Sequence, residues 1–341
     1  MFDFNEKITK HTKQRFAQML QEIQDQIGFK VSSRGWCYLM EQAGHISKDQ
    51  FSKVEDAINR LRKDGTLPVD FVAEEDARSF SGIEEPSDQE NGIDDVLKWM
   101  LRDVKQGARY FTPDWWEGET YYIQMLVEKI DLKTLFEPVC KEYHIPIANS
   151  KGWSSILQRA EYCKRFKEAE EKGLTCVLLY CGDHDPDGLR ISDMLRKNLE
   201  DVSEIVWDDG TEGYDPEFLI IERFGLNYDF ILKHGYSWIN NLMTGRGGNL
   251  NDPKHPFYNL PYVQDYLKTV GARKCEANAM VTTPEVAKQF VRDAIESYLG
   301  EGAKDRFAFK REVADERYKK RLSELGISQK IDDAINFLNG L

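Results

Sequence analysis

The sequence predicts an α/β protein in which a small helical module precedes a doubly wound, mostly parallel sheet. The apolar run at residues 176–181 is too short and too continuous for an amphipathic helix, and is typical of a strand buried on both faces. Similar short runs alternate with helical patterns between residues 121 and 224, which is typical of a parallel sheet. Three helical patterns before residue 65 predict the separate module.

Length and composition indicate a globular protein of about two domains. The chain has 341 residues, of which 41% are hydrophobic and 31% charged. It contains no apolar run of membrane-spanning length and no signal peptide, and its six cysteines form no CxxC pair. We therefore expect a cytoplasmic protein with reduced thiols and no membrane partner. The net charge of −13 argues against general affinity for nucleic acid, so DNA binding would need a local basic site.

Residues 1–80 are predicted to form a winged-helix-like module. Helical patterns cover residues 3–27, 33–43 and 47–64, with glycines as stop signals, and residues 66–72 are expected to return as an extended segment. This order is that of a variant of the helix-turn-helix DNA readers. Three basic side chains near the end of the third helix are the candidate DNA contacts of the module: Arg60, Arg62 and Lys63.

Tyr38 projects away from the apolar stripe of the second predicted helix. At about 100° per residue, Trp36 and Met40 share the buried face, whereas Tyr38 lies nearly opposite, on a face with Arg34 and Glu41. One interpretation is an exposed tyrosine that packs on an arginine. The other is a functional phenol with a cation one helical turn away.

The composition changes between residues 81 and 95, where acidic residues mix with Gly, Pro and Ser and no basic residue occurs. This is typical of a solvated linker. The sheet domain is expected at residues 96–300 and a helical segment at 301–341. Strands are predicted at 121–127, 145–148, 176–181, 204–207 and 218–224. Helices are predicted at 96–105, 132–143, 154–171, 189–199, 228–234, 283–299 and 314–341.

The strand at residues 176–181 leads directly into an acidic turn, Gly182-Asp-His-Asp-Pro-Asp-Gly188. In an extended segment Asp183 and Asp185 point the same way, and two such charges about 4 Å apart repel by ~4 kcal/mol at an effective dielectric near 20. Carboxylates on a tight turn are the ligands that Mg²⁺ prefers. The alternative is that Asp183 or Asp187 only caps the helix that follows.

Several motifs, in the same order, resemble those of one enzyme family. The turn Asp183-His-Asp-Pro-Asp-Gly188 resembles the metal-binding turn of TOPRIM domains, in the form found in the A subunit of type IIB topoisomerases (topoisomerase VI) and the related meiotic double-strand-break transesterases. Glu128 ends the strand at 121–127, as the glutamate of a TOPRIM domain does. Arg34-Gly-Trp-Cys-Tyr38 is similar to the Arg-x-x-Tyr-Tyr segment that carries the family's catalytic tyrosine. Residues 75–78 and 273–279 are similar to two further family segments.

The resemblance extends over residues 30–298 and implies a chemistry. Tyr38 of one protomer of a homodimer would attack a phosphate of double-stranded DNA beside the metal turn of the other protomer, and leave a tyrosyl 5′-phosphate. Arg34 would supply a cation, and Glu128 would serve catalysis and metal binding. The implied Mg²⁺ (or Mn²⁺) ligands are Glu128, Asp183 and Asp185, with Asp187 as a further candidate.

The resemblance also implies partners. Lys129 and Arg190 are expected to contact DNA near the turn, and Glu276 is expected to support the site. A complete strand-passing enzyme would need a separate B-type ATPase subunit, because this chain has no nucleotide-binding pattern. The protein would associate with the nucleoid when bound to DNA.

Two other functions stay open. One is a metal-dependent TOPRIM nuclease, for instance in defence against phages or plasmids, that uses water as nucleophile and Tyr38 only to bind DNA. The other is a DNA-binding dimer without catalysis. Tyr38→Phe distinguishes the transesterase from the nuclease. Asp183→Ala distinguishes both enzymes from the DNA-binding dimer.

Overall fold

The computed structural model describes residues 10–73, 92–150, 155–244 and 248–339, and the chain divides into two compact units. The first comprises Met1–Glu74 and Glu119–Leu299, and the second comprises Glu75–Gly118 and Gly300–Leu341. The predicted boundaries differ, since they group residues 96–118 with the sheet. Of the predicted linker, residues 81–91 lie outside the described residues, and residues 92–95 belong to a helix.

The first unit contains a four-stranded parallel sheet in the order β2-β1-β3-β4. The strands are β1 (Tyr121–Val127), β2 (Ile147–Asn149), β3 (Thr175–Cys181) and β4 (Ile220–Gly225). The pair β1 and β3 aligns from Tyr121 opposite Thr175 to Val127 opposite Cys181, so the two strands end at the same level. The predicted α/β class and parallel sheet are confirmed.

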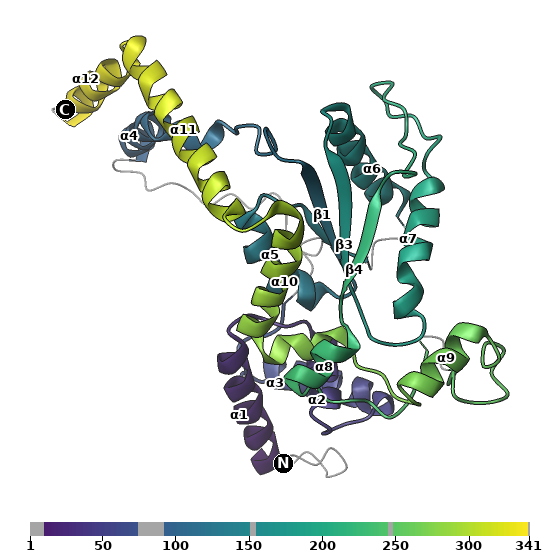
Figure 1. The fold of residues 1–341 in the computed structure, drawn as a ribbon. Helices are drawn as coiled ribbons and strands as arrows, with labels where there is room; N and C mark the ends of the chain where they lie inside the picture. The colour runs from purple at the N-terminus through teal and green to yellow at the C-terminus, as the bar shows by residue number, and fades with distance from the viewer. Residues whose placement is uncertain (1–9, 74–91, 151–154, 245–247, 340–341) are drawn as a thin grey trace. The chain divides into compact units, whose positions relative to one another are not determined.

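Helices cover both faces of this sheet (Figure 1). Because β2 and β3 lie on opposite sides of β1, right-handed crossovers place α5 (Ile130–Glu142) on one face and α6 (Ile156–Glu171) on the other. Helix α7 (Ile191–Glu200) lies with α6, and α10 (Pro284–Leu299) packs against α5. The doubly wound arrangement follows from this strand order.

The predicted strand at residues 204–207 is wrong. Val206 makes only an isolated bridge with Glu212, and Trp207 N–H donates to the Thr211 carbonyl over 2.9 Å. The segment therefore turns back on itself through Gly210 and does not join the sheet. Its side chains offer little to bury, and Val206 is 69% exposed.

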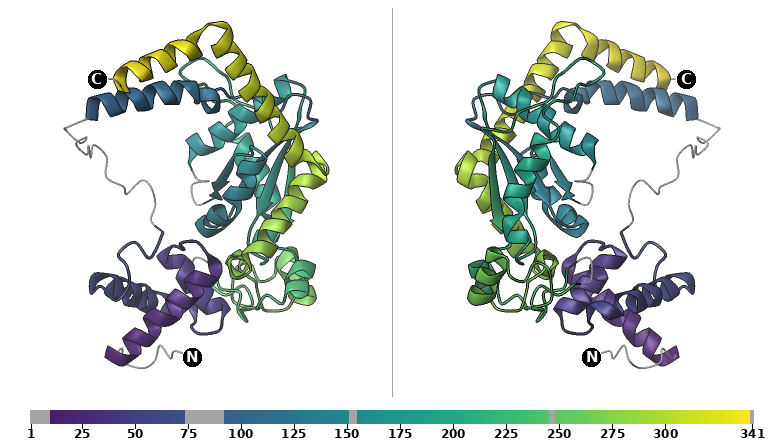
Figure 2. Two further views of the ribbon diagram at one scale, coloured as in Figure 1. Left: turned by 90° about the vertical axis from the view of Figure 1, so that its left-hand side faces the viewer. Right: turned by 90° about the vertical axis from the view of Figure 1, so that its right-hand side faces the viewer.

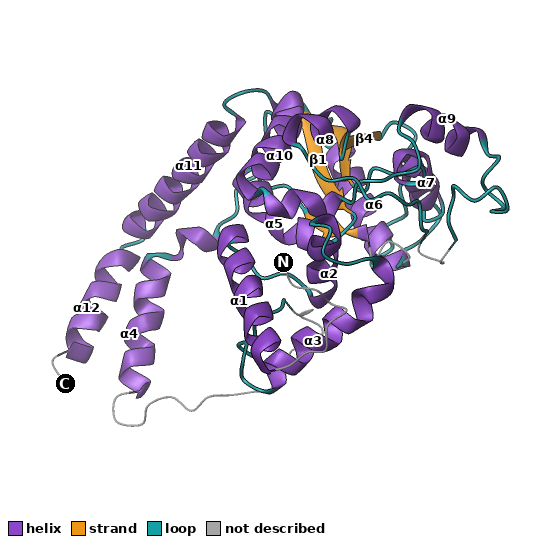
Figure 3. Ribbon diagram, turned by 90° about the horizontal axis from the view of Figure 1, so that it is seen from below, coloured by secondary structure: helices purple, strands orange, loops and turns teal. Residues whose placement is uncertain are grey.

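The N-terminal part of the first unit is helical (Figure 3). Its helices are α1 (Lys10–Ile27), α2 (Ser33–Gln42) and α3 (Phe51–Lys63), and a 3₁₀ turn at Lys48–Gln50 precedes α3. The predicted extended return at residues 66–72 is wrong, because the segment consists of turns and bends. Pro68 has no N–H for a ladder, and its carbonyl instead accepts from Phe71 N–H over 3.1 Å.

After β4, the first unit has two helices that the sequence predicts, of which α10 is one, and two helical elements that it does not. Helix α8 (Tyr228–His234) is as predicted. Helix α9 (Pro261–Thr269) and a 3₁₀ helix at Ala277–Thr282 are not predicted. Helix α9 buries Val263 and Tyr266 against Leu242 and Leu250, so a local core holds this part of the chain.

The second unit is formed by helices (Figure 2). Helix α4 (Gly92–Lys105) lies alongside α12 (Ile327–Asn339), and Lys105 Nζ is 2.6 Å from Asp332. The predicted helix at 314–341 is in fact the end of α11 (Ala303–Glu324) followed by α12. The break falls at Gly326, whose φ of 64° is left-handed.

All six cysteines are buried and free, in agreement with the prediction of reduced thiols. Within the part of the chain that the structure describes, none of the helices combines the length and apolar character that a membrane span requires.

Candidate functional site

Glu128 and Asp183 lie together because β1 and β3 end side by side. Each residue follows the last strand positions, Val127 and Cys181, which are paired. The Asp183 backbone N–H donates to Glu128 Oε2 over 2.8 Å, and the Glu128 backbone N–H donates to the Cys181 carbonyl over 2.9 Å. The structure thus brings together two residues whose proximity the sequence predicts.

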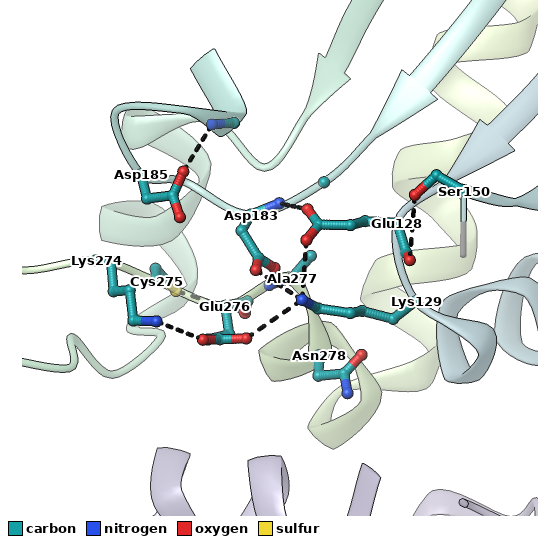
Figure 4. A network of polar contacts seen from close by, with 12 residues as sticks. Glu128, Lys129, Ser150, Asp183, Asp185, Lys274, Cys275, Glu276, Ala277 and Asn278 are labelled. Atoms are coloured by element: carbon teal, nitrogen blue, oxygen red, sulfur yellow. Dashed lines mark hydrogen bonds and ion pairs between the residues drawn. The ribbon is translucent and has the colours of Figure 1, made fainter. Parts of the chain in front are cut away.

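Lys129 directs its ammonium into these carboxylates (Figure 4). Its Nζ atom is 2.9 Å from Glu128 Oε1, 2.8 Å from Asp183 Oδ2 and 3.5 Å from Glu276 Oε2. The sequence predicts Lys129 as a DNA contact, whereas its charge is used inside the protein. Burial of the neighbouring carboxylates explains the difference, since they need a cation nearby.

Glu276 also contacts Lys129, from the segment just before the 3₁₀ helix at Ala277–Thr282. The segment is held by reciprocal backbone bonds between His184 and Cys275, and Ala277 N–H donates to Asp183 Oδ1 over 2.8 Å. Glu276 Oε1 accepts from Lys274 Nζ over 2.6 Å and from Lys48 Nζ over 3.0 Å. We call the resulting set of six side chains the charge cluster: Lys48, Glu128, Lys129, Asp183, Lys274 and Glu276.

Burial and charge act in opposite directions on the cluster. Burial lowers the pKa of Lys129, but Asp183, Glu128 and Glu276 outweigh it and hold this pKa well above its ordinary value. Burial raises the pKa of Glu276, yet the three lysines bring it down to about 2. For Asp183, burial and the carboxylates of Glu128 and Glu276 raise the pKa well above the ordinary value. The ion pairs therefore form in a site with little screening by water.

The other two aspartates of the turn face elsewhere. Asp185 Oδ1 accepts from Gly188 N–H over 2.6 Å, which closes the turn before the 3₁₀ helix at Gly188–Arg190 (Figure 4). Asp187 is exposed and accepts from the Tyr262 hydroxyl over 3.0 Å. The capping alternative is wrong for both residues that it names, because Asp183 accepts from Lys129 and Ala277, and Asp187 stands at the N-cap position without a side-chain cap bond.

As arranged, the predicted ligands do not fit a divalent ion. Among the described residues, no three Asp, Glu, His or Cys side chains are grouped so that they could hold a metal. Glu128 and Asp183 already bind an ammonium, and Asp185 is used by the turn. Mg²⁺ or Mn²⁺ at this site remains a prediction, and the chemistry below uses the chain's own groups.

Arg223 fixes the backbone of the acidic turn through hydrogen bonds. Its guanidinium donates to the carbonyls of Asp183 over 2.9 Å, Gly188 over 3.0 Å and Leu226 over 3.0 Å. With a further bond to the Gly182 carbonyl over 3.3 Å, one planar side chain from β4 fixes four backbone carbonyls. No sequence signal identifies this role, because an arginine within a strand is usually exposed.

Tyr38 is positioned by the start of α2. Ser32 caps the helix by accepting from Gly35 N–H over 3.0 Å, and its own N–H donates to buried Asp131 on α5 over 3.0 Å. A Cβ at Gly35 would collide with the Asp131 carboxylate, so this glycine permits the close approach of α2 to α5. The helix is therefore fixed to the sheet side of the first unit.

The Tyr38 ring lies among three cations. Its centroid is 5.2 Å from Lys129 Nζ, 6.0 Å from Lys48 Nζ and 5.9 Å from Arg34 Cζ. The side chain is half-buried and packs edge-on against Phe51. Burial raises the pKa of the phenol, and Lys129 and Arg34 oppose that shift. Glu41 does not share an exposed face with Arg34 as predicted, because it is buried, with 7% exposure.

The remaining predicted DNA contacts differ in their surroundings. Arg60 and Lys63 are exposed at the end of α3, whereas Arg62 holds the following turn through the Val69 carbonyl over 2.7 Å. Arg190 lies over the Tyr262 ring, 4.7 Å from its centroid. The family-like segment at 75–78 lies outside the described residues.

Sequence reasoning does not find two of the three lysines of the charge cluster, Lys48 and Lys274. The available signal was the alternation of Lys274 and Glu276 in an otherwise small and apolar segment, since two charges there must be paired. Comparison of the chain with family models, with curated proteins and with solved structures finds no match.

Proposed function

We propose that this chain binds double-stranded DNA and cleaves it by transesterification, with Tyr38 as the nucleophile, in the manner of the A subunit of type IIB topoisomerases. The observation that carries the proposal is the set of three cations around the Tyr38 ring: Lys129, Lys48 and Arg34. A half-buried phenol among cations is a place where a phosphate diester and an attacking oxygen can meet.

The chemistry requires a phenolate and a bound phosphate. An ordinary tyrosine has a pKa near ~10 and is mostly protonated at neutral pH. Burial keeps the pKa of the Tyr38 phenol raised overall, although Lys129 and Arg34 act against that shift, so the phenol must lose its proton during the attack. Arg34 is exposed enough to bind a phosphate oxygen. The Tyr38 oxygen forms a bond to phosphorus while one P–O ester bond of the strand breaks. The phenol proton leaves to solvent, and the departing strand oxygen takes up a proton.

The rest of the first unit has matching roles in this proposal. Helices α1 to α3 would act as the winged-helix-like DNA-binding module, with the exposed Arg60 and Lys63 on phosphates. The parallel sheet would act as a TOPRIM-like domain, which its strand order and the adjacent Glu128 and Asp183 support. A homodimer and a separate ATPase subunit belong to the same proposal.

A trapping experiment tests the proposal. Supercoiled plasmid is incubated with the protein, in Mg²⁺, in Mn²⁺ and in a chelator, and the reaction is stopped with detergent. We expect DNA breaks with the protein bound covalently to a strand end, and loss of this adduct in Tyr38→Phe. Tyr110→Phe is a matched control, because Tyr110 is 67% exposed and belongs to the second unit.

Two outcomes would replace the proposal. Breaks without adduct that persist in Tyr38→Phe would indicate a nuclease that uses water. Binding without breaks under all three conditions would indicate a DNA-binding protein.

A further inference from the structure

Three carboxylates of the charge cluster converge on one cation position, and a side chain of this protein occupies it. Lys129 Nζ lies 2.8 to 3.5 Å from oxygens of Glu128, Asp183 and Glu276. These acids come from three separated segments: the end of β1, the turn after β3 and the segment before the last 3₁₀ helix. The three acids together provide the negative charge that attracts a cation, and the cation that they surround is an ammonium (Figure 4).

The cluster has no excess of negative charge that would require a further cation. Its three carboxylates face three ammonium groups, since Lys274 and Lys48 both bind Glu276. The side chains of Asp183 and Glu276 are only 7% and 3% exposed, so an added divalent charge would be poorly screened. It would also compete with Lys129 for the same oxygens.

The structure keeps Lys129 in this position. Its backbone precedes α5, and its carbonyl accepts from Lys133 N–H over 3.2 Å in the first turn of that helix. Its side chain is 19% exposed, and the Tyr38 ring lies 5.2 Å from the ammonium. Withdrawal of the ammonium would leave two or three buried carboxylates without their shared partner, which is costly.

We propose that the ammonium of Lys129 is the resident cation of this site and takes the place of a divalent ion. It holds Glu128, Asp183 and Glu276 together and presents a fixed positive charge to Tyr38. Only the role of this charge toward Tyr38 rests on the proposed function. Metal binding can be measured without DNA cleavage.

The test is a titration of metal-free protein with Mn²⁺, followed by electron paramagnetic resonance and calorimetry. We expect the parent protein and its Asp183→Asn variant to give the same Mn²⁺ titration, because the parent has no Mn²⁺ site at the charge cluster. Lys129→Met should create one Mn²⁺ site per chain, because a competing charge a few ångströms away is gone. Adding Asp183→Asn to that variant should abolish the new site.

A matched control is Lys141→Met, which removes an exposed lysine from the helix that follows Lys129 and should change nothing. Circular dichroism shows whether each variant is folded. If Lys129→Met does not fold, Lys129→Gln replaces it in the titration. The proposal is overturned if the parent protein binds one Mn²⁺ that Asp183→Asn removes, or if a folded Lys129 variant gains no site. Either result leaves the trapping experiment with Tyr38 unaffected, so the two proposals fail separately.

Discussion

The backbone amide of Asp183 donates to the carboxylate of Glu128 over 2.8 Å, although 55 positions separate them in the chain. The bond exists because two parallel strands end at one level, and it fixes the first acid of the turn after β3 against the acid after β1. The backbone N–H of Asp183 is thereby used to orient Glu128, while its side chain receives Lys129. The cluster is thus built on the sheet, and substitutions in it should affect stability as well as activity.

Glu276→Gln should destabilise the protein by about 3 kcal/mol, because it leaves buried Lys274 without a counter-charge. Urea unfolding followed by circular dichroism measures the change. Glu285→Gln is the control, since Glu285 is 82% exposed and pairs only with Lys288 at the surface. Equal stability of the two variants would contradict the buried ion pair.

The parts of this site that sequence predicts are those set by local periodicity. Strand β1 is predicted to the residue and β3 to within one, and the parallel order then requires Glu128 and Asp183 to meet. The role of Lys129 is different, because a flexible side chain after a strand can point to solvent or inward. The carboxylates of Glu128, Asp183 and Glu276, which come together only in the folded chain, decide this.

Contacts between distant segments have no local signal. Lys48 and Glu276 are 228 positions apart, and their ion pair depends on how the helical module packs against the segment before the last 3₁₀ helix. The same holds for Glu41, whose burial comes from tertiary packing rather than from the pattern of its helix. At residues 204–207 the local pattern misleads in the opposite way. The short apolar run suggests a strand, but its backbone hydrogen-bonds across the turn that follows and does not join the sheet.

The dependence of stability on pH should show the contribution of Glu276. Its pKa in the folded protein is about 2, below the ordinary 4.5, so its stabilisation is present above pH 4.5 and is lost as the pH falls toward 2. The stability gap between parent and Glu276→Gln should therefore narrow by about 2 kcal/mol between about pH 6 and about pH 3.

Asp183 acts in the opposite sense. Its folded pKa is raised, so its contribution is greatest below its unfolded value and is lost as the pH rises through the folded one. Comparison of parent and Glu276→Gln at each pH cancels most of this effect. A gap that stays constant or widens on acidification would contradict the assignment of the low pKa to Glu276.

Arg223→Lys should loosen the acidic turn. Arg223 donates from two separate nitrogens, Nε to Gly188 and Nη2 to Asp183 and Leu226, and the single nitrogen of a lysine does not occupy both positions. We therefore expect a loss of about 1–3 kcal/mol. Hydrogen exchange of the amides at residues 182–188 should accelerate. Arg196→Lys is the control, because Arg196 donates to the Leu219 carbonyl over 2.7 Å, away from the turn. Unchanged exchange in the turn would rule out this role for Arg223.

Charge reversal at the end of α3 tests the DNA-binding part of the proposal. Arg60→Glu with Lys63→Glu should weaken DNA binding and lower the slope of log affinity against log salt by about 2, since each lost phosphate contact removes ~0.9. Fluorescence anisotropy at several salt concentrations measures the slope. Lys141→Glu, on the exposed side of α5, should leave it unchanged. An equal slope in the parent protein and the double variant would mean that DNA does not bind at the end of α3.

Mixing two inactive variants tests which chain supplies the tyrosine. The resemblance implies that Tyr38 works with the acidic turn of a partner, whereas here its ring lies 5.2 Å from Lys129 of its own chain, which binds Glu128 and Asp183. We therefore expect that Tyr38→Phe and Glu128→Gln, mixed under conditions that exchange subunits, form no adduct with DNA. If tyrosine and acids came from different chains, half of the dimers would carry one intact site, and about a quarter of the parent activity would return. Labelling the two variants with different tags and recovering both through one tag shows that exchange has occurred, so an inactive mixture then means that one chain contains the whole site.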